Sequence, residues 1–133
     1  MKISKRDDFS LIFMSVLAKT NDKKGFVSLS TVAQETHLSP LFLKHIALTL
    51  KGKGLVESRE GVAGGYRLTR SPEKITVAEI ISSETHGCIS LSCNHTTCRI
   101  DKGNCLCYPF WNRVGKEMFS VLEKITLSDF IKQ

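Results

Sequence analysis

Apolar residues recur every three or four positions near the start of the chain. In residues 7–20, DDFSLIFMSVLAKT, this spacing predicts an amphipathic helix. The turn-like sequence NDKKG follows, and a second, shorter helix is predicted over residues 28–37, SLSTVAQETH. The apolar face expected for the first helix consists of Phe9, Ile12, Phe13, Val16 and Leu17.

A third helix is predicted after a tight break at Leu38. Ser39 is a good N-cap residue, and Pro40 suits the first helical position. Gly52 and Gly54 then end the helix. Two short helices joined by a tight turn are typical of a helix-turn-helix. The apolar face of the third helix consists of Leu43, Ile46, Ala47 and Leu50.

Two strand-like runs come next. In residues 54–70, GLVESREGVAGGYRLTR, the runs LVES and YRLT flank a glycine-rich loop with arginines at its base, which predicts a β-hairpin. A hairpin directly behind a helix-turn-helix is a wing. The expected fold is therefore mainly α with a small β-hairpin wing, a winged helix-turn-helix whose second short helix enters the major groove of DNA. The alternative is a small α+β fold without a ligand.

The second half of the chain opens with another helix, in residues 75–84, ITVAEIISSE, where Thr76 and Glu79 form a capping box. A long helix is expected near the C-terminus. Its apolar residues are spaced by three and four, which favours a long C-terminal dimerisation helix, with an intramolecular core stripe as the alternative. The seam consists of Trp111, Val114, Met118, Val121 and Ile125.

These elements divide the 133 residues into three parts. We expect a winged helix-turn-helix DNA-binding domain in residues 1–74, a linker helix with a cysteine-rich loop in residues 75–107, and the dimerisation helix with a C-terminal tail in residues 108–133. Hydrophobic residues make up 41% of the chain, which is enough for a core.

The excess of positive over negative charge lies entirely in residues 1–74. Residues 1–74 contain 13 Lys and Arg against 7 Asp and Glu, whereas residues 75–133 contain six of each. Such an asymmetry favours a basic half that meets a polyanion, although the same excess of charge also suits an ordinary soluble surface.

The N-terminal sequence gives an expectation about location. It has acidic residues where a signal peptide would be apolar, and the uncharged run FSLIFMSVLA is too short to span a bilayer. We therefore expect a cytoplasmic protein that does not bind a membrane.

All five cysteines lie in residues 87–107, GCISLSCNHTTCRIDKGNCLC. In a reducing compartment, clustered cysteines are metal ligands or redox groups more often than disulfides. Soft thiolates in a loop suit an iron–sulfur cluster. From spacing alone a tetrahedral zinc site is slightly favoured, because small Cys/His clusters most commonly bind zinc, and thiol oxidation without a metal stays open as a third interpretation. The zinc ligands would be Cys93, His95, Cys98 and Cys105.

The residues give no sign of catalysis, since no Ser/His/Asp or Cys/His arrangement has a credible catalytic context. We therefore do not expect an enzyme.

A known family shares these features. The chain resembles the iron–sulfur winged-helix regulators of the Rrf2 family, typified by IscR and NsrR. The resemblance lies in residues 38–81, which include the segment AGGYRLTRSPEKITVAEI, in the cysteine-bearing loop, and in the helix that opens with Trp111. The similarity runs from Met1 to about Asp129. The resemblance implies a homodimeric transcription factor that acts as a repressor on double-stranded operator DNA. Its cluster is expected to sense nitric oxide, redox state or iron–sulfur supply and to alter the affinity of the protein for the operator.

The resemblance also implies a ligand set. Cys105 stands six residues before Trp111, as the last ligand does in similar proteins. The family commonly has five residues in each gap, whereas the gaps here hold four and six, and Cys88 and Cys107 are additional cysteines that could replace an outer ligand. The implied cluster ligands are Cys93, Cys98 and Cys105.

Three thiolates leave one ligand to be found. Tyr108 occupies the place where IscR-like members carry a histidine, and Asp8 matches in position the acidic residue with which NsrR-like members complete a 4Fe-4S cluster from the other subunit. The resemblance therefore favours a 4Fe-4S cluster, with a 2Fe-2S cluster as an alternative and His95 as a local alternative ligand. Asp7 and Asp8 would also suit the first turn of a helix simply as negative charges.

The remaining site predictions concern DNA. Lys44 and His45 lie opposite the apolar face of the third helix, where similar proteins contact bases and the family often has a Glu-Gln pair. Arg59 and Arg67 flank the predicted wing. The candidate DNA-binding residues are Ser39, Lys44, His45, Arg59, Tyr66 and Arg67.

Overall fold

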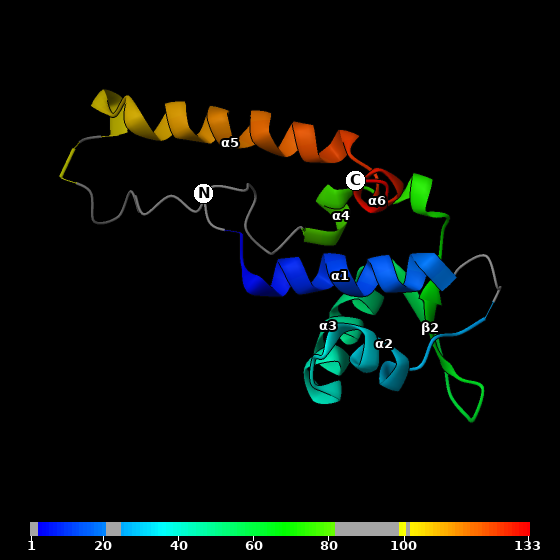
Figure 1. Cartoon of the computed structure of the whole chain (residues 1–133). Helices are drawn as coiled ribbons and strands as arrows, with labels where there is room; N and C mark the ends of the chain where they lie inside the picture. Colours follow the sequence, from blue (N-terminus) through cyan, green and yellow to red (C-terminus); the bar gives the residue numbers. More distant parts are fainter. Residues whose placement is uncertain (1–2, 21–24, 82–98, 101) are drawn as a thin grey trace.

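The computed structural model describes residues 3–20, 25–81, 99–100 and 102–133. Within these ranges the chain is mainly helical with one two-stranded antiparallel hairpin, which confirms the predicted fold class (Figure 1). The elements in chain order are α1 Lys5–Thr20, α2 Leu29–Thr36, α3 Pro40–Gly52, β1 Val56–Arg59, β2 Gly65–Leu68, η2 Pro72–Lys74, α4 Val77–Ile81, η3 Lys102–Asn104, α5 Cys107–Lys124 and α6 Leu127–Ile131.

Helix α1 begins two residues earlier than predicted because Ser4 caps it. The amide of Asp7 donates to the Ser4 hydroxyl oxygen at 3.2 Å, and the Ser4 amide donates to the Asp7 carboxylate at 3.1 Å. The helix buries Phe13 and Leu17 as predicted. Ile12 was expected on the same face, but it is 37% exposed, and Met14 is buried instead. The apolar face is therefore rotated slightly toward Met14.

The turn between α2 and α3 is short because His37, a residue other than glycine, adopts the left-handed conformation. His37 has φ 56° and ψ 23°, and its amide donates to the carbonyl of Ala33 at 2.8 Å. Ser39 then caps α3 by accepting the amide of Phe42 at 3.2 Å, and Pro40 is the first helical residue. The predicted helix-turn-helix is present, with the predicted cap.

Helix α1 lies at the centre of the core. It packs against α2, α3, α4, α6 and β2, and the four predicted apolar residues of α3 are fully buried beneath it. The end of the chain joins the same core, since Leu127 of α6 is fully buried and the amide of Leu127 donates to the carbonyl of Ile75 at 2.8 Å. The division of the chain at residues 74 and 107 stays a prediction, to which the structure adds this return of the C-terminus.

The hairpin is displaced by one residue from each predicted run. Its register pairs Val56 with Leu68 and Arg59 with Gly65. Val27 adds a bridge to Tyr66, with both backbone hydrogen bonds at 2.8 Å. Gly65 has φ 144°, and a Cβ there would lie 2.2 Å from the carbonyl oxygen of Val27. Only glycine fits where the wing meets this bridge.

The capping box predicted for α4 is present. The amide of Thr76 donates to the Glu79 carboxylate at 2.8 Å, and the amide of Glu79 donates to the Thr76 hydroxyl oxygen at 3.2 Å. The described part of this helix ends at Ile81, because residues 82–98 lie outside the described residues. None of the described helices has both the length and the apolar character needed to cross a membrane.

Helix α5 lies on the side of the molecule opposite α2 and α3, and its N-terminal end reaches beyond the rest of the helical body (Figure 1). Gly115 is its one buried residue. The predicted seam is wrong at Ile125, which lies past the helix end as its C-cap. Trp111 and Val121 are 46% and 55% exposed, so an intramolecular stripe does not account for them.

The turn at His37 generates a prediction. A β-branched residue is strained in the left-handed region, so His37→Val should lower the free energy of unfolding by about 1–2 kcal/mol. His37→Gly is the matched control, because glycine adopts this conformation without strain. Urea unfolding followed by circular dichroism measures both. Equal stability of the valine variant and the parent would contradict a left-handed turn.

Candidate nucleic-acid interface

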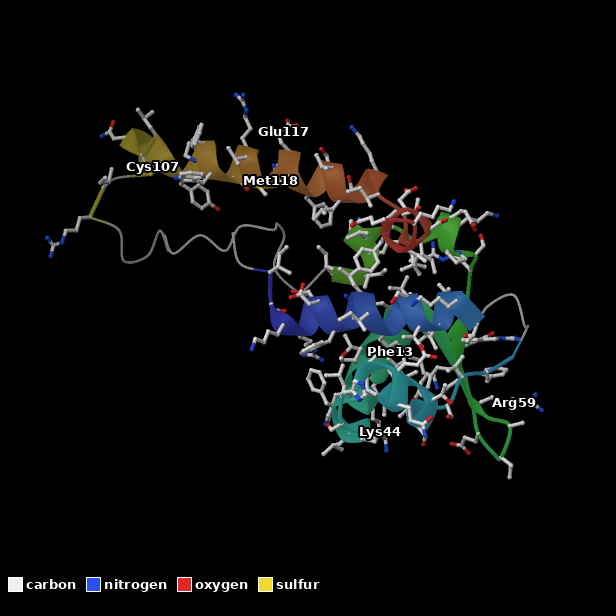
Figure 2. The ribbon with its side chains drawn as sticks, in the orientation of Figure 1. Phe13, Lys44, Arg59, Cys107, Glu117 and Met118 are labelled. Carbon is white, nitrogen blue, oxygen red and sulfur yellow. The ribbon has the colours of Figure 1, made fainter. Side chains whose placement is uncertain are left out.

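The outer face of α3 carries charged and polar side chains that the core does not use. Lys44 and His45 are exposed, whereas their neighbours Leu43 and Ile46 are fully buried. Figure 2 shows Lys44 at the surface of α3, on the far side of this helix from Phe13 of α1. The helix therefore presents Lys44 and His45 outward, as the sequence predicts.

Hydrogen bonds attach α3 to three other segments. The Lys51 ammonium donates to the Ser58 hydroxyl of β1 at 2.6 Å, and Arg6 of α1 donates to the Thr49 hydroxyl at 2.6 Å. Lys53, the C-cap residue of α3, donates to the carbonyl of Ile80 in α4 at 2.8 Å. No local pattern in the sequence predicts these contacts, because each joins residues that only the tertiary fold brings together.

The environment of Lys53 also changes its acidity. Partial burial lowers the pKa of the Lys53 ammonium because it removes water from the charge, whereas the negative charge of Asp7 acts in the opposite direction. The ammonium therefore lies between the start of α1 and the end of α4, and it contacts the last turn of α4 directly.

The wing presents Arg59 at the end of β1. Its side chain is exposed and points outward in Figure 2. In the part of the chain that the structure describes, the Arg59 guanidinium has no side-chain hydrogen bond or ion pair. Such an arginine is available for a phosphate, which accepts from guanidinium groups through paired oxygens.

Arg67 and Tyr66 are placed differently. The Arg67 guanidinium forms an ion pair with Glu57 on the neighbouring strand and lies 4.6 Å from the ring centroid of Phe26. The half-buried Tyr66 ring packs edge-on against Phe13, with centroids 6.1 Å apart. A phosphate at Arg67 would have to compete with Glu57. The strand pattern could have found this pair, because Glu57 and Arg67 face each other in the hairpin register.

Ser39 uses its hydroxyl oxygen to cap α3, and it is exposed at the helix N-terminus. Its hydroxyl hydrogen therefore remains available for an anion at a helix end that already favours negative charge.

The structure describes only part of the predicted cluster site. Cys105 is half-buried and Cys107 is exposed, and both are free thiols. The remaining predicted ligands and their neighbours lie outside the described residues, so the ligand set stays a prediction. Among the residues that are described, no three potential metal ligands come together. Those outside are Cys88, Cys93, Cys98, His86 and His95.

The two aspartates of α1 have different surroundings. The Asp7 carboxylate accepts from the Ser4 amide at 3.1 Å and from the Ser4 hydroxyl at 2.6 Å, so it belongs to the helix cap. The Asp8 side chain is exposed, and it makes no hydrogen bond or ion pair with any described residue. Asp8 is thus the aspartate that remains available to an external ligand.

Comparison with known proteins gives a consistent picture. A family model described as Rrf2, iron-dependent transcriptional regulator, matches residues 3–133. IscR of Xenorhabdus nematophila is an HTH-type transcriptional regulator, 27% identical over 137 residues that cover 99% of this chain and 80% of that protein. Among solved structures, T. potens IscR is 31% identical with a TM-score of 0.73, covering 99% of this chain and 87% of the other.

A second solved structure belongs to a different kind of regulator. CymR, described as the global cysteine regulator of Bacillus subtilis, is 28% identical with a TM-score of 0.76, and the match covers 99% of this chain and 97% of CymR.

The interface predicts distinct effects of two substitutions on DNA binding. If Lys44 contacts base edges as the sequence predicts, Lys44→Ala should narrow the difference in affinity between duplexes selected from a random pool and scrambled duplexes. Arg59→Ala should weaken all duplexes similarly and reduce the dependence of affinity on salt, because a phosphate contact carries no sequence information. Fluorescence anisotropy at several salt concentrations measures both effects.

Lys124→Ala is the matched control. It also removes one positive charge, but from the last turn of α5, on the other side of the molecule from α3. This variant should bind like the parent. Affinity that does not respond to salt, to Lys44→Ala or to Arg59→Ala would rule out this surface as the interface.

Proposed function

The chain belongs to the Rrf2 family of transcriptional regulators, and we propose that it is a homodimeric repressor whose affinity for operator DNA is controlled by an iron–sulfur cluster. In this proposal residues 1–74 bind DNA, residues 75–107 hold the cluster, and residues 108–133 form the dimer contact. The signal is nitric oxide, redox state or iron–sulfur supply. The observation that carries DNA binding is the exposed basic surface of Lys44 and Arg59 on a winged helix-turn-helix, since neither side chain pairs with another described residue.

The chemistry of the donors suits a cluster. The proposed ligands are the thiolates of Cys93, Cys98 and Cys105, with Asp8 from the other subunit. Cys105 is a free, half-buried thiol that stands just before α5, and soft sulfur donors of this kind hold iron. When bound, the cluster would supply iron that reacts with small molecules and changes redox state. The description of the family as iron-dependent supports the same assignment.

The contacts of the two aspartates support the choice of Asp8 over Asp7. Asp7 is held by Ser4, and its removal from the cap would cost helix stability, whereas Asp8 has no such role to lose. A carboxylate oxygen binds iron less firmly than a thiolate does. A site completed by Asp8 would therefore open readily to a small attacking molecule, which is a property that a gas sensor requires.

The exposed apolar residues of α5 support the dimer. Phe110 and Trp111 pack edge-on with centroids 5.1 Å apart, yet both are about half exposed. Val121 is exposed about three turns further along the helix. A second copy would remove these side chains from water, since apolar burial is favourable in proportion to area. Two-fold symmetry would also place two recognition helices on adjacent half-sites.

The contacts of α3 offer a route from the cluster to DNA. Arg6, two residues before Asp8, donates to Thr49 of α3. Lys53 at the end of α3 donates to the carbonyl of Ile80, one residue before α4 ends. The cysteine-bearing segment begins at Gly87, six residues after Ile81. Along the chain, Asp8 is therefore two residues from one hydrogen bond to α3, and the start of the cysteine-bearing segment is seven residues from the other.

A second candidate function is a regulator controlled by thiols, by zinc or by a protein partner. The exposed, free thiol of Cys107 favours it, because this cysteine is surplus to the proposed ligand set and accessible to oxidants. CymR, which is named a cysteine regulator, is similar over nearly the whole chain. Zinc would use Cys93, His95, Cys98 and Cys105.

The cluster proposal predicts how each cysteine variant absorbs light. Protein purified without oxygen should contain iron and sulfide and show visible charge-transfer bands. Replacing Cys93, Cys98 or Cys105 by Ala should abolish these bands because a thiolate ligand is lost. Cys107→Ala and Cys88→Ala are the matched controls and should retain them. Loss of the bands in Cys107→Ala together with their retention in Cys105→Ala would show that Cys107, not Cys105, is the third ligand. A colourless parent protein that contains zinc would favour the second candidate function.

Substitutions of Asp7 and Asp8 should affect different properties, namely the stability of the fold and the stability of the cluster. Asp8→Ala should speed cluster loss in nitric oxide and leave the free energy of unfolding of the apoprotein nearly unchanged. Asp7→Ala should lower that free energy by about 1 kcal/mol, since it removes the cap, and leave the cluster spectrum unchanged. Absorption spectra and urea unfolding measure the two properties. An Asp8→Ala protein with the parent's spectrum and rate of cluster loss would exclude the cross-subunit ligand.

A further inference from the structure

Leu41 is an apolar residue on a surface where polar residues are expected. It is the second residue of α3 and is 69% exposed. Its neighbour Phe42 packs edge-on against Phe9 of α1, with ring centroids 5.4 Å apart. Leu41 itself is absent from the hydrophobic core and from the apolar residues that pack against that core. The fold therefore does not explain a large apolar side chain at this position.

The position of Leu41 relates it to the proposed DNA contact. Residues three and four apart lie on the same face of a helix, so Leu41 shares the outer face of α3 with Lys44 and His45. This face lies away from α5, whose exposed apolar residues are the proposed dimer contact (Figures 1 and 2). A second copy bound at α5 would thus leave Leu41 uncovered, on the face that also presents the exposed Lys44.

We propose that Leu41 is a specificity-determining residue that packs against the 5-methyl group of a thymine in the operator. The N-terminal residues of a recognition helix are those that contact base edges. Leu41 has no donor or acceptor, and the thymine methyl is the apolar group that the major-groove edge displays. This inference rests on the proposed binding of DNA by α3, but it does not depend on the iron–sulfur cluster.

Helix geometry places the thymine relative to a second contact. Lys44 lies three residues further along α3, a rise of about 4.5 Å, and base pairs are about 3.4 Å apart. Lys44 favours guanine, which presents two acceptors in the major groove. The preferred half-site should therefore contain a thymine and a guanine within about two base pairs of each other.

The test uses the whole protein and removes only the methyl group. Duplexes are first selected from a random pool with the parent protein, and each thymine of the selected half-site is then replaced by deoxyuridine. At one position this replacement should weaken binding of the parent by about fourfold, the value expected for one buried methyl group. Leu41→Ala should bind the thymine and deoxyuridine duplexes equally. Fluorescence anisotropy at constant salt gives the affinities.

Leu48→Ala is the matched control, since Leu48 is 52% exposed on the same face two turns further along α3. This variant should keep the parent's fourfold preference for thymine at that position. Equal loss on deoxyuridine substitution in the parent and in Leu41→Ala, or no sensitive thymine at all, would overturn the role of Leu41 while leaving DNA binding in place. Failure of the parent to select any sequence would instead remove the proposed function and, with it, this inference.

Discussion

The central burial of α1 is the constraint on which the rest of the structure depends. Phe13 and Leu17 leave almost no surface exposed, and the helix packs against both the DNA-binding elements and the C-terminal helix α6. Because interiors are close-packed, α1 cannot shift without moving its neighbours. Its N-terminal turn is the part that escapes this packing. Any ligand held there, such as one at Asp8, therefore acts on an element that the whole core contacts.

The same constraint explains why the wing and α3 form one unit. Tyr66 of β2 packs on Phe13, while its backbone pairs with Val27 ahead of α2. Lys51 connects the end of α3 to Ser58 of β1. The recognition helix and the wing are consequently held in fixed positions relative to each other. Simultaneous contact with a groove and with the flanking phosphates requires such a fixed arrangement.

Local features of the fold were predictable, and long-range ones were not. The Ser39 cap, Pro40 and the capping box of Thr76 each depend on residues within one helical turn, so the sequence alone identifies them. The exposure of Ile12 and the end of α5 before Ile125 depend on what packs against them. In the candidate interface, the outward position of Lys44 followed from periodicity, whereas the engagement of Arg67 by Glu57 depends on strand register.

The hydrogen bonds of α3 to other elements have free energies of the size that allosteric regulation requires. Allosteric coupling between two sites typically amounts to about 1–3 kcal/mol, and a net hydrogen bond contributes about 0.5–1.5 kcal/mol. Two bonds that differ between the cluster-bound and cluster-free states would therefore suffice to change DNA affinity severalfold. Arg6 to Thr49 and Lys53 to the Ile80 carbonyl are two such bonds. They connect α3 to the first turn of α1, two residues before Asp8, and to α4, which precedes the cysteine-bearing segment, so a change in either place would act directly on α3.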